Sequence, residues 1–168
     1  MKILGIDPGT LVMGWGVVES DGDALSLVDF GAITVPGSLQ IGERLSRLYN
    51  ELLKVIKKHL PDAVAVEQPF VAKNVRTALA IGRAQAIALL AAAGKGIPTF
   101  EYTPAQVKQR VSNYGASSKE QIQEMVRLQL GLAQVPEPND AADALAVALC
   151  HVQEMHVNDL LNRQEERR

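Results

Sequence analysis

The chain has 168 residues, of which 47% are hydrophobic, 21% are charged and only 4% are aromatic. This length and composition predict one globular domain with an aliphatic core, without repeats or low-complexity linkers. The single cysteine, Cys150, excludes an internal disulfide bond and a multi-cysteine zinc site. No apolar run has the expected length of a membrane span and the N-terminus lacks a signal-peptide layout, so we expect a cytoplasmic protein.

The charge is distributed unevenly along the chain. The net charge is −2, yet residues 73–127 contain eight lysines and arginines against three glutamates. This asymmetry indicates either one basic face on an otherwise acidic body or simply a few solvated helix faces; charge alone favours neither.

Three strands are predicted first, over residues 2–7, 14–20 and 24–35, with an Asp-Gly turn at 21–23 that is typical of a hairpin. Apolar residues then follow a helical period over 39–60, before Pro61. A short apolar strand at 63–67, an Ala-rich helix at 74–93 and a strand at 97–102 come next. Further helices are expected to start at Thr103 and Ser118, and a final helix covers about 139–155.

This order of elements predicts an α/β fold. Hairpins join the first three strands, so these should be antiparallel, whereas the later strands return through helices and should be parallel. We therefore expect a mixed five-stranded sheet flanked by helices, in a single domain over residues 1–156. The polar tail, residues 157–168, is expected to be frayed.

Carboxylates occur where chemistry is expected in such a sheet. Asp7 and Glu67 each end an apolar strand, and sites form at the carboxyl ends of parallel strands. Asp140 and Asp143 are three residues apart, which places them on one face of the first turn of the final helix. Four converging acids repel one another unless cations intervene, and oxygen ligands suit Mg²⁺ or Mn²⁺. Two such ions can promote phosphodiester hydrolysis.

Two other interpretations explain part of this pattern. Asp140 and Asp143 alone could equally be an acid in the N-terminal turn of a helix and a surface residue, although that accounts for neither Asp7 nor Glu67. The opening turn after the first strand, Asp-Pro-Gly-Thr, is also similar to the phosphate loop of actin-like ATPases and sugar kinases. Those proteins need a second glycine-rich loop and a second domain, which this sequence lacks.

Taken together, "GIDPGT", "GWGVV", "VAVEQPFVAKN", "EYTPAQVKQ" and "NDAADALAVA" resemble the RuvC family of Holliday-junction resolvases. The resemblance implies an RNase H-like fold and a homodimer that uses Mg²⁺ to cut two opposite strands of a four-way DNA junction, in recombination and repair. It implies that Asp7, Glu67, Asp140 and Asp143 bind the metal, with two ions per site and Mn²⁺ as a substitute. It also implies RuvA and RuvB as partners.

The resemblance gives further residues an expected role. Helix 77–93 is apolar nearly all round, so we expect it to form the dimer contact, with Ala84 and Ala88 in the interface. Phe70 should lie in a loop beside the site and stack on an unpaired base. The remaining expected DNA contacts are basic: Lys108 and Lys119 near the scissile phosphate, and Lys73, Arg76 and Arg110 on the flanking backbone.

Two alternative functions remain open at this point. The first is a module that binds branched DNA without cutting it, in which the acids are vestigial. The second is another RNase H-like nuclease that acts on RNA–DNA hybrids or linear ends. The complete set of four acids argues against the first, and the apolar helix together with Phe70 argues against the second.

Overall fold

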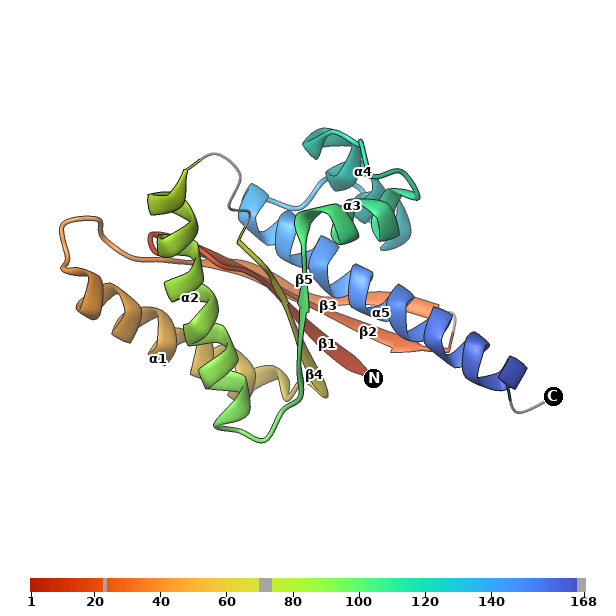
Figure 1. The fold of residues 1–168 in the computed structure, drawn as a ribbon, viewed down its shortest axis with the longest axis horizontal. Helices are drawn as coiled ribbons and strands as arrows, with labels where there is room; N and C mark the ends of the chain where they lie inside the picture. Colours follow the sequence, from red (N-terminus) through yellow and green to blue (C-terminus); the bar gives the residue numbers. More distant parts are fainter. Residues whose placement is uncertain (23, 70–73, 166–168) are drawn as a thin grey trace.

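The computed structural model describes residues 1–22, 24–69 and 74–165, and it contains one five-stranded sheet (Figure 1). The strands are β1 (Lys2–Asp7), β2 (Val12–Asp21), β3 (Ala24–Thr34), β4 (Ala63–Glu67) and β5 (Thr99–Tyr102). Their order across the sheet is β3-β2-β1-β4-β5. The β1–β2 and β2–β3 pairs are antiparallel, whereas β1–β4 and β4–β5 are parallel. The predicted mixed, RNase H-like sheet is therefore confirmed.

Helices cover both faces of this sheet (Figure 1). One face packs against α1 (Ile41–His59) and α2 (Val75–Ala93). The other face packs against α5 (Asn139–Glu165), which is flanked by α3 (Pro104–Ser112) and α4 (Lys119–Gln129). Alternation along the strands produces the two layers: Leu4 and Ile6 enter the α1–α2 core, whereas Ile3 enters the α5 core.

Glycines let α5 lie directly on β1 and β2. A Cβ atom added at Gly5 would be 2.0 Å from the backbone oxygen of Ala144, and one at Gly14 would be 1.9 Å from that of Asp140. Side chains at these positions would hold the helix away from the sheet. This close approach fixes the first turn of α5 near the carboxyl end of β1.

The element boundaries differ from the predicted ones mainly at the C-terminus. The helix starts expected at Thr103 and Ser118 are confirmed, since both residues cap their helices in capping boxes. The final helix, predicted to end near Met155, instead continues to Glu165. The predicted domain boundary at residue 156 therefore falls inside α5. The polar residues after Met155 keep a helical backbone because no proline or glycine interrupts them.

Candidate active site

Five charged residues, one from each of five elements of the fold, line one pocket of about 370 Å³ at the carboxyl end of the parallel strands. They are Asp7, Glu67, Lys108, Lys119 and Asp143. Asp7 ends β1 and Glu67 ends β4, and the preceding residues Ile6 and Val66 are paired in the sheet. The two carboxylates are therefore neighbours because of strand register. All the charged residues in the lining of this pocket were predicted as site residues from the sequence.

The environment of the two strand-end acids favours their protonated forms. Burial, followed by the nearby charges of Asp143 and Asp140, raises the pKa of Asp7 to about 7. Burial, followed by the charges of Asp7 and Asp143, raises the pKa of Glu67 to about 8. Without a bound cation, the pocket therefore holds more negative charge than it can stabilise at neutral pH.

The first turn of α5 contributes the remaining acids, and a lysine partly neutralises them. Lys119 begins α4, and its Nζ lies 2.5 Å from Oδ2 of Asp143. Burial lowers the pKa of Lys119, but the hydrogen bond to Asp143 and the charges of Asp143, Asp7 and Asp140 outweigh this and raise it. Asp140 is half-buried and close enough to act on both Asp7 and Lys119, although it does not line the pocket.

The donor set fits a hard divalent cation by its chemistry. The carboxylates supply only oxygen ligands, which Mg²⁺ and Mn²⁺ prefer. The raised pKa values of Asp7 and Glu67 indicate that a cation in the pocket would stabilise their ionised forms. Over residues 1–22, 24–69 and 74–165, however, no three acids, histidines or cysteines are gathered within reach of one ion. The ammonium group of Lys119 lies against Asp143, so cation binding requires these side chains to rearrange.

The other predicted DNA contacts are more dispersed. Arg76 is exposed in the first turn of α2 and does not line the pocket. Arg110 does not line the pocket and forms an ion pair with Glu154, about three turns beyond Asp143 on α5. The sequence did not reveal this pairing, because the two residues are far apart in the chain. Phe70 and Lys73 lie outside the described residues.

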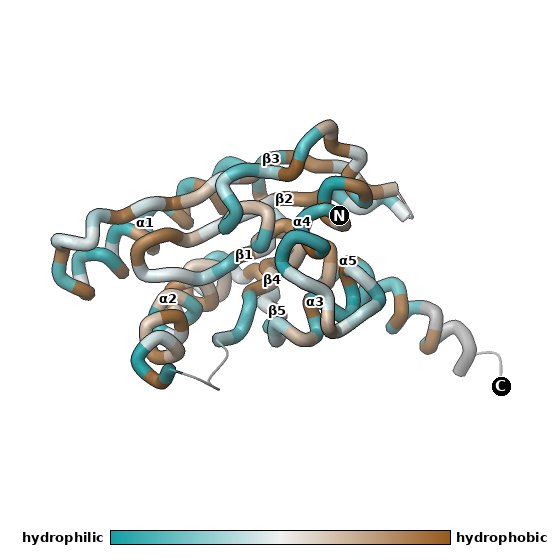
Figure 2. The backbone as a smooth tube through the Cα atoms, turned by 90° about the horizontal axis from the view of Figure 1, so that it is seen from above, coloured by the Kyte–Doolittle hydropathy of each residue, from teal (hydrophilic) through white to brown (hydrophobic). Residues whose placement is uncertain are grey.

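Figure 2 shows that apolar residues predominate along α2. Some of them are exposed, but they are not the residues that the sequence predicted. Ala84 and Ala88 are fully buried within the monomer, so their expected place in a dimer interface is wrong. The exposed apolar residues are instead Val75, Leu79, Ala86, Leu90 and Ala93, and the exposed Arg83 lies among them. By length and composition alone, α2 could also cross a membrane, contrary to the expectation from the sequence. Core helices of soluble proteins can have the same length and composition, and α2 packs against α1.

Comparisons with known proteins agree with this geometry. The family model for the crossover junction endodeoxyribonuclease RuvC matches residues 3–151. Proteins of that name from Dehalococcoides mccartyi and Chloroflexus aggregans are 60% and 59% identical to this chain, over 90% of it and 92% of each relative. The structure of Thermus thermophilus RuvC in complex with a Holliday junction substrate superposes with a TM-score of 0.88 at 35% identity, covering 94% of this chain and 96% of that one. The chain therefore belongs to the RuvC family.

Proposed function

We propose that this protein is an endonuclease that resolves four-way DNA junctions by paired, metal-dependent hydrolysis of phosphodiester bonds in opposite strands. The observation that carries the proposal is the meeting of Asp7, Glu67 and Asp143 with Lys108 and Lys119 in one pocket. Family membership supports it, because the similar relatives are named crossover junction endodeoxyribonucleases. The similar structure from Thermus thermophilus contains a Holliday junction.

The four carboxylates have the role of holding the cation. Asp7 and Glu67 are the fixed part of this set, since both lie in strand backbone, and Asp140 and Asp143 complete it from α5. When bound, Mg²⁺ supplies an activated water and neutralises charge on the phosphate, with two ions per site and Mn²⁺ as a substitute. The strand positions keep the acids in place while the substrate enters.

The two lysines have the role of binding the phosphate that is cut. Lys119 contacts Asp143 in the free protein, and its ammonium group would be available to the substrate once Asp143 served as a metal ligand. Lys108 enters the same pocket from α3. Positive charge held at these two points stabilises the negative charge that develops on the phosphate during hydrolysis. We expect Lys108→Ala and Lys119→Ala to slow cleavage more than they weaken binding.

A homodimer completes the proposal, because a four-way junction has two cleavage points related by twofold symmetry. We assign this dimer contact to the exposed apolar residues of α2, which the monomer leaves uncovered. Phe70, Lys73 and Arg76 are kept as proposed DNA contacts around each site. Arg110 is also a proposed DNA contact, but its ion pair with Glu154 must break before it can bind a phosphate. The cytoplasm is the proposed location, and RuvA and RuvB are the proposed partners.

The proposal is tested by offering the protein three labelled substrates: a mobile four-way junction, a linear duplex and an RNA–DNA hybrid. Each is incubated with Mg²⁺, with Mn²⁺ and with chelator. We expect paired nicks only in the junction and only with a divalent cation. Equal cutting of linear duplex or hybrid, or cutting in chelator, would contradict the proposal. Tight junction binding without cutting would instead support a binding module.

A further inference from the structure

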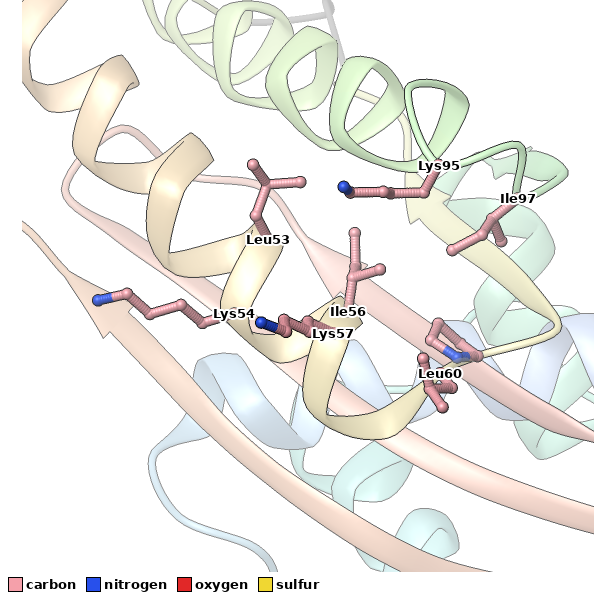
Figure 3. A pocket seen from close by; sticks show the side chains of 8 residues that line it. Leu53, Lys54, Ile56, Lys57, Leu60, Lys95 and Ile97 are labelled. Atoms are coloured by element: carbon pink, nitrogen blue, oxygen red, sulfur yellow. The ribbon is translucent and has the colours of Figure 1, made fainter.

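Figure 3 shows a second pocket, between the end of α1 and the α2–β5 connection. It lies at the opposite end of the parallel strands from the candidate active site. The last turns of α1 and the connection from α2 to β5 line it, and it encloses about 590 Å³. These segments lead into the amino ends of β4 and β5, whereas Asp7 and Glu67 lie at carboxyl ends. We name this pocket the α1–α2 groove; its lining is Leu53, Lys54, Ile56, Lys57, Leu60, Pro61, Lys95 and Ile97.

One apolar residue of the groove is exposed at a conformational cost. Leu60 ends α1 with φ 49°, in the left-handed region that glycine or asparagine adopts more easily. Its side chain is 73% exposed, the largest fraction among the exposed large hydrophobic side chains that the structure describes. A leucine that is both strained and solvated adds little to the stability of the monomer. Contact with another molecule would account for it.

The charge around the groove has one sign. All its charged lining residues are lysines: Lys54, Lys57 and Lys95. Lys54 pairs with Glu51 at 2.6 Å. For Lys57 and Lys95 there is no acidic partner among the residues that the structure describes. Figure 3 shows the Lys95 side chain extending from the α2–β5 connection toward Leu53. An occupant of the groove therefore meets apolar groups flanked by free positive charge.

These features select among three occupants. Duplex DNA would place phosphates beside the lysines, but it would leave the apolar lining residues, such as Leu53 and Ile97, without an apolar partner. A second copy bound groove to groove would bring the same lysines together and be repelled. In an amphipathic segment with leucines on one face and carboxylates beside them, the leucines would contact the apolar lining and the carboxylates would pair with the lysines. We propose that the α1–α2 groove binds an acidic, leucine-bearing amphipathic segment of a partner protein.

The position of the groove allows this segment and DNA to bind together. The carboxylate pocket lies at the carboxyl ends of the parallel strands and the groove lies near their amino ends. A partner in the groove therefore does not compete with DNA for the active site. Such a contact would let another protein hold the nuclease while it acts. The inference does not depend on cleavage activity.

The test measures binding of a fluorescein-labelled helical peptide built from repeated Glu-Glu-Leu-Leu units by fluorescence anisotropy. We expect saturable binding to the full chain, weakened at least about 10-fold by Leu60→Gly and by Lys57→Glu. Leu60→Gly suits the left-handed backbone, so the helix end should persist and the melting temperature should not fall. Arg47→Glu, an exposed reversal elsewhere on α1, and Leu128→Ser, an exposed leucine on α4, are the matched controls and should bind normally.

Three outcomes would overturn the proposal. The first is no saturable binding at about 100 μM protein, or equal binding of a peptide with lysine in place of every glutamate. The second is a loss of four-way-junction affinity in Lys57→Glu that matches the loss of peptide affinity, which would make the groove a DNA contact. The third is dissociation of a dimer by Leu60→Gly in sedimentation, which would make it a self-association surface.

Discussion

The helices α2 and α5 are both rich in alanine and aliphatic residues, yet the fold uses them differently. The first part of α5 is enclosed by the sheet, α3 and α4, and every residue from Ala144 to Val152 is buried. By contrast, α2 contacts α1 and the sheet on one side and leaves Val75, Leu79 and Leu90 exposed. A buried helix can fix acids at an active site, whereas a half-covered apolar helix is suited to assembly. Similar composition therefore does not imply a similar role.

The strongest test of this contrast is at the start of α5. We expect Asp143→Asn to lower the rate of junction cleavage at least about 10³-fold, or roughly 4 kcal/mol in activation free energy. The change removes a proposed metal ligand and a partner of Lys119. Junction binding should persist or tighten, because one repulsive charge is lost. Gel-shift assays in chelator and cleavage assays in Mg²⁺ measure the two effects.

The matched control is Asp159→Asn, which changes an exposed acid near the other end of the same helix. It should cut at the normal rate. Substantial cleavage by Asp143→Asn, or an equal loss in Asp159→Asn, would contradict the assignment of the first turn to metal binding. Asp7→Asn should behave as Asp143→Asn does.

Two glycine substitutions, one beneath α5 and one in α2, probe how tightly each helix is packed. Gly5→Ala would place a methyl group 2.0 Å from the backbone oxygen of Ala144 in α5, so the helix must move. We expect a loss of at least about 3 kcal/mol in the free energy of unfolding. Gly82→Ala in α2 meets no atom within 4 Å in the monomer and should improve helix propensity by about 0.5–1 kcal/mol. Urea unfolding measures both; a similar loss in the two variants would contradict the contrast.

The exposed face of α2 is tested by adding charge to it. We expect Leu90→Glu to weaken dimerisation at least about 100-fold, or roughly 2.7 kcal/mol, with little effect on the folded monomer. Sedimentation velocity over a range of concentrations measures the change. Leu128→Glu on α4 is a similarly exposed control and should leave the sedimenting mass unchanged. A wild-type protein that sediments as one chain at micromolar concentration would remove the basis for this prediction.

The buried acids Asp7 and Glu67, close to the first turn of α5, predict that the free energy of unfolding depends on pH. In the folded protein the pKa of Asp7 is raised from 3.8 to about 7 and that of Glu67 from 4.5 to about 8. Between about pH 4 and 8 the folded state therefore binds more protons than the unfolded state, so stability falls as the pH rises. In chelator we expect the free energy of unfolding to fall by about 1–2 kcal/mol from pH 5 to pH 8. Each group whose pKa is raised would change the free energy of unfolding by up to about 1.4 kcal/mol per pH unit. We expect a smaller change because solvent in the open pocket screens the charges.

Urea unfolding in chelator at several pH values measures this dependence. Asp7→Asn should flatten it, because one of the two raised groups is removed and the other loses a repulsive neighbour. Added Mg²⁺ should also flatten it by favouring the ionised carboxylates. Identical slopes for the wild type and Asp7→Asn would contradict the prediction.

The sequence predicted the sheet and the polar lining of the pocket because both depend on local patterns. Apolar runs that end in Asp7 and Glu67 identify strand ends, and the alternation of hairpins and helices determines which strands are parallel. Parallel neighbours bring their carboxyl ends together, so the acids meet. The same reasoning could not identify the outer face of α2. That helix has almost no polar stripe, so Ala84 and Ala86 are equivalent by composition.

The sequence by itself determined the elements, the strand directions and the acids that meet, since these follow from periodicity, capping and chain order. Only the tertiary structure decided which ionic partner each charge has. Lys119 pairs with Asp143 and Arg110 pairs with Glu154, in each case across two different helices. It also decided that Ala84 is buried while Leu60 and Leu90 are exposed. Burial and ion pairing depend on what packs against a side chain, and local sequence does not specify its distant neighbours.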